Sequence, residues 1–162
     1  MAEKIDIAPN HDNELVLARI MDATPEQLFK VWATPERYSE WFCPKPWRAE
    51  ATKMDLRSGG TSEITMYGPD GEVFPQPGRY LEVVPNEKIV FTDAFAGDWV
   101  PAADGGMMTC VLTFERRPDG RTLYLARCGH PSAEKKAQHE QMGFHDGWGI
   151  VAEQCEALAK TL

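Results

Sequence analysis

The C-terminal stretch Ser132–Leu162, SAEKKAQHEQMGFHDGWGIVAEQCEALAKTL, decides the fold, and its spacing predicts one helix with two different halves. In the second half, apolar residues recur at three- and four-residue steps, which forms a single stripe that can pack against a core. These residues are Val151, Cys155, Leu158 and Leu162. We therefore expect the second half to anchor the helix.

The first half of this helix carries Gly143, Gly147 and Gly149. Each glycine costs a helix about 1 kcal/mol relative to alanine, so their presence needs a reason. Glycines let another group approach the helix backbone closely, and that group could be a strand, a large aromatic side chain or a ligand. We favour a ligand cavity. The alternative is that a bulky strand residue such as Tyr80 fills the space.

Composition places limits on the class of protein. The chain has 162 residues and is 43% hydrophobic, which suits one domain with a substantial core. We expect a flexible N-terminal tail over residues 1–13 and a single domain over residues 14–162.

The formal net charge of −8 argues against nucleic acid and membrane surfaces as partners. The polar N-terminus and the lack of a long apolar run predict a cytoplasmic protein.

The N-terminal third predicts one strand followed by two short helices. Residues Glu14–Met21 read as a strand. Thr24 is a suitable N-cap before Pro25, and Gln27 can complete the cap of a first helix. A second Thr-Pro-Glu start at 34–36 predicts a shorter helix that ends near Trp41 and Phe42.

From residue 47 to residue 130 the pattern changes to alternating strands joined by tight turns. The expected strands are Arg48–Leu56, Thr61–Tyr67, Gly78–Val84, Lys88–Phe95, Met107–Glu115 and Thr122–Cys128. Residues 69–71, 85–87 and 118–120 have turn chemistry, and residues 96–106 are expected to form a mobile loop. Hairpin turns imply an antiparallel sheet, so the fold class is α+β, with one long helix on one face of that sheet.

Several motifs in this order resemble the SRPBCC superfamily, also called START-like or helix-grip proteins. The motifs are Trp41-Phe42, Asp55-Leu56-Arg57-Ser58-Gly59-Gly60, Pro69-Asp70-Gly71, the segment from Val84 to Phe91, and Gly147-Trp148 followed by Leu158. The chain more closely resembles the branch homologous to the C-terminal domain of the activator of the heat-shock protein 90 ATPase. The resemblance implies a curved sheet of about six to seven strands wrapped around the C-terminal helix, with an apolar cavity between them.

Large aromatic and methionine side chains, with one histidine, are the candidates for the lining of such a cavity. They are Trp41, Phe42, Trp47, Met66, Tyr80, Phe95, Trp99, Met108, Phe144, His145 and Trp148. The alternative for each of them is plain core packing, because large apolar residues are buried in any fold. His145 stands out as a polar group among the glycines, and its alternative is a solvent-facing helix residue.

No metal site, cofactor or catalytic residue is assigned from the sequence. His130, His139, His145 and Cys128 do not follow a known zinc-binding spacing, and residues 139 and 145 would lie on opposed faces of a continuous helix. The cysteines are scattered, which is typical of small buried side chains, and none is paired with a base in a recognisable motif.

Three functions remain as hypotheses. The first is binding of a small hydrophobic molecule in the cavity. The second is an interaction with a chaperone, which the short segment before the first strand makes less favourable. The third is a cyclase or hydrolase acting on a polyketide-like substrate, with His145, Tyr80 or His130 as acid or base. The protein is expected to be a monomer or a homodimer.

Overall fold

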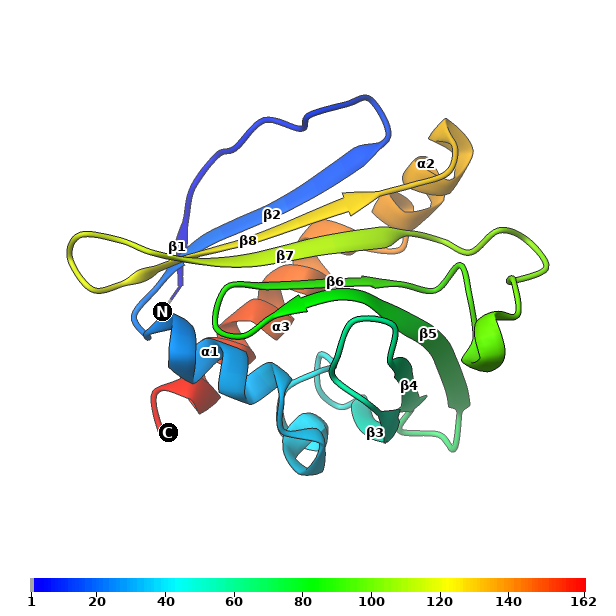
Figure 1. Ribbon diagram of the computed structural model, residues 1–162, viewed down its shortest axis with the longest axis horizontal. Helices are drawn as coiled ribbons and strands as arrows, with labels where there is room; N and C mark the ends of the chain where they lie inside the picture. Colours follow the sequence, from blue (N-terminus) through cyan, green and yellow to red (C-terminus); the bar gives the residue numbers. More distant parts are fainter. Residues whose placement is uncertain (1) are drawn as a thin grey trace.

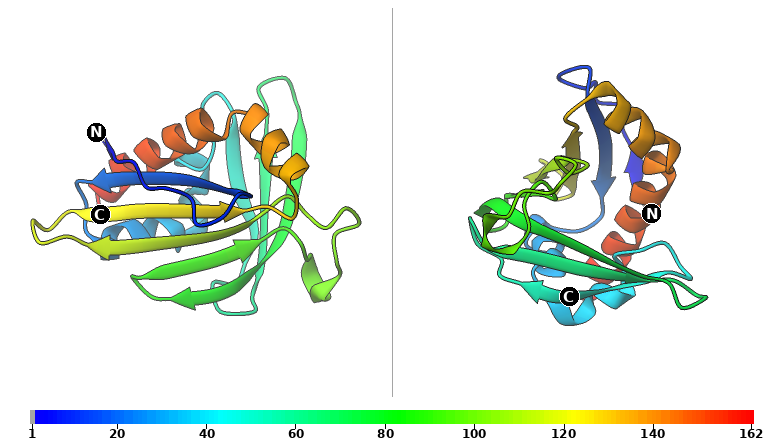
Figure 2. Two further views of the ribbon diagram at one scale, coloured as in Figure 1. Left: turned by 90° about the horizontal axis from the view of Figure 1, so that it is seen from above. Right: turned by 90° about the vertical axis from the view of Figure 1, so that its right-hand side faces the viewer.

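Eight antiparallel strands form one sheet in the computed structural model, which describes residues 2–162 (Figure 1). Their order in the sheet is β1-β2-β8-β7-β6-β5-β4-β3. The strands are β1 (Glu3–Lys4), β2 (Glu14–Met21), β3 (Arg48–Met54), β4 (Thr61–Tyr67), β5 (Val73–Val84), β6 (Lys88–Thr92), β7 (Thr109–Arg116) and β8 (Thr122–Gly129). The sheet curves around the last helix (Figure 2), which confirms the α+β helix-grip fold.

Three α-helices and two short 3₁₀ helices complete the chain. The α-helices are α1 (Pro25–Trp32), α2 (Ala133–Gln141) and α3 (Phe144–Ala159), and the 3₁₀ helices are η1 (Pro35–Glu40) and η2 (Gly97–Trp99). Helix α1 starts as its sequence predicts. The Thr24 hydroxyl accepts from the Gln27 amide at 3.2 Å, and the Gln27 side chain accepts from the Thr24 amide at 2.9 Å.

The C-terminal segment is not one helix, so the prediction of a continuous helix is wrong. Helix α2 ends at Gln141, and α3 begins at Phe144 after a sharp turn. Gly143 makes the turn in the left-handed region, with φ of 91° and ψ of 35°, a conformation that glycine adopts without steric cost. This glycine is therefore explained by a helix break and not by close packing.

The other two glycines have different surroundings. A Cβ at Gly147 would meet nothing within 4 Å, whereas a Cβ at Gly149 would lie 2.9 Å from the Arg19 guanidinium. Of the three glycines, only Gly149 has another group packed close to its backbone, and this group is the Arg19 side chain. Tyr80 does not fill the space beside Gly147.

Strand β5 starts earlier than its sequence suggests, at Val73 and not at Gly78. Pro75 and Pro77 lie in its first half, where β4 is the paired neighbour. Pairing with β6 begins only at Arg79, so the first half of β5 has no strand on that side. Proline lacks a backbone N–H group and is tolerated there, because no hydrogen bond to β6 is required.

The N-terminal residues that we expected to form a flexible tail include a short strand. Glu3 and Lys4 pair with Ile20 and Arg19 of β2, and Ala2 is buried. The N-terminal end of the described chain therefore adds an eighth strand to the edge of the sheet.

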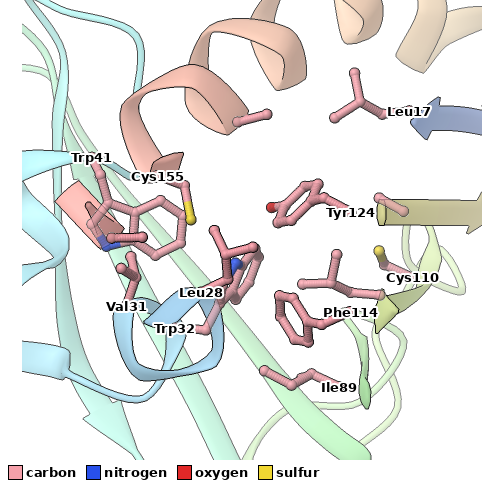
Figure 3. Packing of buried hydrophobic residues seen from close by; sticks show 14 of the residues in the cluster. Leu17, Leu28, Val31, Trp32, Trp41, Ile89, Cys110, Phe114, Tyr124 and Cys155 are labelled. Carbon is pink, nitrogen blue, oxygen red and sulfur yellow. The ribbon is translucent and has the colours of Figure 1, made fainter. Parts of the chain in front are cut away.

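The core lies between α1, α3 and the concave face of the sheet (Figure 3). Leu28 and Trp32 of α1, Cys155 of α3 and Tyr124 of β8 point toward one another there. All four cysteines are free and buried, and they fill space as small apolar groups. Within residues 2–162, no helix combines the length and apolar character that crossing a membrane requires.

Candidate functional site

A pocket of about 400 Å³ lies between the turn that joins α2 to α3 and the concave face of the sheet. This volume is within the range of small-molecule sites. Residues from all three α-helices, from strands β4, β5, β6 and β8, and from the loops after η1 and after β6 contribute to its wall. The wall comprises Trp32, Phe42, Cys43, Pro44, Ser62, Ile64, Met66, Gln76, Pro77, Gly78, Phe91, Thr92, Asp93, Met108, Tyr124, His139, Met142, Gly143, Phe144, Gly147, Trp148 and Val151.

Helix α3 turns one face to the pocket. Phe144, Gly147, Trp148 and Val151 are wall residues at steps of three and four, which places them on one side of the helix. The missing side chain at Gly147 leaves room between its larger neighbours, since a Cβ there would meet no atom within 4 Å. This first half of α3 therefore has a groove where a regular helix would have a filled surface.

Aromatic rings form the helix side of the pocket. The rings of Phe144 and Trp148 are 5.1 Å apart, and the His139 ring stands edge-on to Phe144, also at 5.1 Å. On the opposite side, the Trp32 ring lies 5.9 Å from Phe42 and 5.7 Å from Phe91. These contacts hold the rings in fixed orientations and give the pocket two aromatic walls.

Helix α3 also positions the loop after η1. The Gln154 amide nitrogen donates to the carbonyl oxygens of Trp41 at 2.8 Å and Cys43 at 2.9 Å. These two hydrogen bonds fix the backbone beside Phe42, which is part of the wall. The anchoring half of α3 thus supports the pocket from behind.

Two histidines form a hydrogen-bonded pair at the α2 end of the pocket. His130 Nδ1 lies 2.8 Å from the Asn13 carbonyl oxygen, and its Nε2 lies 2.8 Å from Nδ1 of His139. Burial, together with the neighbouring His130, lowers the pKa of His139 to about 4. The His139 ring is therefore neutral near pH 7.

A carboxylate lies at the same end. Asp93 follows β6, and its Oδ1 accepts from the backbone amides of Met107 at 2.8 Å and Met108 at 3.1 Å. These bonds fix the start of β7 beside the pocket. Lys135 of α2 forms an ion pair of 3.0 Å with the exposed side chain of Asp104, which lies in the loop before β7.

The cysteine in the wall is not set up as a nucleophile. Burial raises the pKa of the Cys43 thiol to about 11, so the thiol stays protonated at neutral pH. The three acid or base groups considered for an enzyme do not meet in the pocket either. His145 is exposed and pairs with Glu140, Tyr80 is buried in the core, and His130 lies behind His139.

No group of three or more metal-binding side chains that could hold an ion occurs within residues 2–162. Most of the wall side chains are apolar, which suits contact with an organic molecule, and the few polar ones can form hydrogen bonds with it.

Comparison with known proteins identifies the family. A family model described as "Activator of Hsp90 ATPase homolog 1-like protein" matches residues 22–160, which is most of the chain. The chain belongs to this family. The family assignment and the SRPBCC-type fold support a ligand-binding or an activator-like module. Among curated proteins, none matches the sequence.

Solved structures share the fold of this family member. A crystal structure of a Nitrosomonas europaea protein is 34% identical with a TM-score of 0.84, and the match covers 91% of this chain and 94% of that one. A Mycobacterium smegmatis protein is 27% identical with a TM-score of 0.77, over 94% and 95% of the two chains. An Arthrobacter aurescens protein solved by NMR has 19% identity, a TM-score of 0.80 and coverage of 96% and 92%.

The residues proposed from the sequence divide into two groups in this family member. Phe42, Met66, Met108, Phe144 and Trp148 lie in the pocket wall. The others lie elsewhere: Trp41 and Tyr80 are core residues, Trp47 stacks on Phe74, Phe95 and Trp99 form a pair on the 96–106 loop side, and His145 is exposed.

Sequence reasoning did not single out several wall residues. Trp32 of α1, Phe91 of β6 and Tyr124 of β8 were not among the proposed residues, and they pack on the core while also lining the pocket. His139 was considered only as a metal ligand. The turn at Gly143 is the signal that could have placed it beside Phe144, because it redirects α2.

Proposed function

We propose that the protein binds a small, predominantly hydrophobic molecule in this pocket. The observation that carries the proposal is the groove at Gly147, where nothing lies within 4 Å of a Cβ position although Phe144 and Trp148 flank it on the same helix face. A helix tolerates this cost of about 1 kcal/mol where an open surface is useful. The aromatic walls would supply most of the binding free energy by apolar burial.

The test is a titration with N-phenyl-1-naphthylamine, a neutral hydrophobic fluorophore, followed by fluorescence and by amide chemical-shift changes. Wild-type protein should give saturable binding with shift changes at Phe144, Gly147 and the facing β4 residues. Trp148→Ala removes a wall ring and should weaken binding by about tenfold or more, given the area that a tryptophan buries.

The matched control is Trp99→Ala, because Trp99 is 48% exposed and lies outside the pocket wall. This variant should bind the fluorophore as the wild type does. Shift changes confined to surface loops, or equal losses in the two tryptophan variants, would contradict the proposal.

The family name favours a second candidate, an interaction with the Hsp90 chaperone. Its test is the ATPase rate of purified Hsp90 with and without this protein. A saturable increase in that rate would support the activator function, and an unchanged rate together with no co-elution would remove it.

A further inference from the structure

The histidine pair at the end of the pocket has a defined arrangement of protons. A carbonyl oxygen can only accept, so the contact of His130 Nδ1 with the Asn13 oxygen requires a proton on Nδ1. When His130 is neutral, its Nε2 is then an acceptor. The 2.8 Å contact with His139 therefore requires that His139 donate from Nδ1.

The surroundings of the two rings bear on the charge that each can carry. His130 is only 7% exposed, and no ion pair between it and a carboxylate occurs in the part of the chain that the structure describes. A charge on this buried ring would lack a compensating partner. His139 is held neutral by burial and by His130, as its lowered pKa indicates.

The tautomer leaves Nε2 of His139 without a proton. Among residues 2–162 no hydrogen bond to this atom occurs, and the ring is a partly exposed member of the pocket wall. Because Nδ1 is directed at His130, the Nε2 edge is the polar part of the ring that remains for a ligand. The carboxylate of Asp93, also a wall residue, is a second hydrogen-bond acceptor.

We infer that the α2 end of the pocket selects ligands that carry a neutral hydrogen-bond donor, such as a hydroxyl group, which donates to Nε2 of His139. The inference rests on the proposed function, since it assumes that the pocket takes a ligand. The aromatic walls accept the apolar body of the molecule, and the two acceptors at this end disfavour a carboxylate or phosphate.

The test uses three probes with one ring system: naphthalene, 2-naphthol and 2-naphthoate, titrated at pH 7.5 and followed by amide chemical shifts. We expect 2-naphthol to bind about five- to tenfold more tightly than naphthalene, the effect of one net hydrogen bond. The carboxylate 2-naphthoate should bind more weakly than either. In His139→Phe, which keeps a ring beside Phe144, the affinities for 2-naphthol and naphthalene should agree within about twofold.

A second measurement does not depend on a variant that could disturb folding. Nitrogen-15 NMR of the histidine side chains in wild-type protein should show an unprotonated Nε2 on His139, and its signal should shift when 2-naphthol is added. The control variant is His145→Phe, because His145 is exposed and outside the wall, and it should keep the full preference for 2-naphthol.

The outcomes separate the two proposals. If naphthalene and 2-naphthol bind equally well, if 2-naphthoate binds best, or if Nε2 of His139 carries a proton, the inference fails while ligand binding stands. If none of the three probes binds, the proposed function fails and the inference fails with it.

Discussion

His139 couples the protonation state of the pocket to the stability of the fold. Its pKa lies at about 4 in the folded protein, below the ordinary value of 6.5, because burial and His130 disfavour the charged ring. Between these values the unfolded chain binds more protons, so stability is full above pH 6.5 and is lost as the pH falls toward 4. We expect the free energy of unfolding to decrease by about 1 to 2 kcal/mol over this range. This is less than the full pKa difference would give, because the ring is partly exposed to solvent.

Urea unfolding at several pH values measures this dependence. His139→Gln keeps a donor for His130 and removes the titrating group, so the slope of the unfolding free energy between pH 6.5 and 4 should decrease. His145→Gln changes an exposed histidine and should leave the slope as it is in the wild type. Equal slopes in wild type and His139→Gln would show that His139 does not carry the pH dependence.

At the scale of elements, two glycines of the C-terminal segment should respond to alanine in opposite directions. Gly143 has φ of 91°, so Gly143→Ala forces a side chain into the left-handed region and should cost about 1 to 2 kcal/mol of unfolding free energy. Gly147 lies inside α3 with free space around its Cβ position, so Gly147→Ala should gain up to about 1 kcal/mol.

Chemical denaturation of the two variants checks the stability change, and titration with N-phenyl-1-naphthylamine checks its consequence. The alanine methyl at position 147 would occupy part of the groove, so a more stable protein should bind the fluorophore less well. Unchanged affinity in Gly147→Ala would mean that the groove is not part of the binding surface, and a stable Gly143→Ala would contradict the turn.

The sequence could predict most elements of the sheet because its strands alternate and its turns use glycine and proline. It could not predict that β5 begins at Val73, since Pro75 and Pro77 are acceptable there only because β6 ends before reaching them. That fact depends on the length of a neighbouring strand. The capping residues Thr24 and Gln27, in contrast, interact within one helical turn, so the start of α1 could be predicted from the local sequence alone.

The pocket was less predictable for a related reason. In a continuous helix, His139 and Phe144 would be separated by about 140° around the axis and would face different sides. The turn at Gly143 brings their rings to 5.1 Å. Which aromatic residues face the pocket, and which, like Trp41, are sealed in the core, is decided by this turn and by the curvature of the sheet.

For the whole molecule, stability should be distributed unevenly between the sheet and the pocket wall. Strand β8 is hydrogen-bonded to both β2 and β7 along its length, whereas α2 has no buried residue. Local opening is easiest where few side chains are buried. We expect amide hydrogen exchange to be slowest in β7 and β8 and markedly faster in α2.

A ligand in the pocket should change this pattern in one place. Because α2, the Gly143 turn and the start of α3 all contribute wall residues, added N-phenyl-1-naphthylamine should slow exchange in residues 139–148 while β1 and the β7–β8 turn keep their rates. Binding also raises the free energy of unfolding by an amount that grows with ligand concentration above its dissociation constant. At the same ligand concentration, both effects should be smaller in Trp148→Ala, because its binding is weaker. Slowed exchange in β1 with unchanged rates in residues 139–148 would place the ligand elsewhere than between the two C-terminal helices and the sheet.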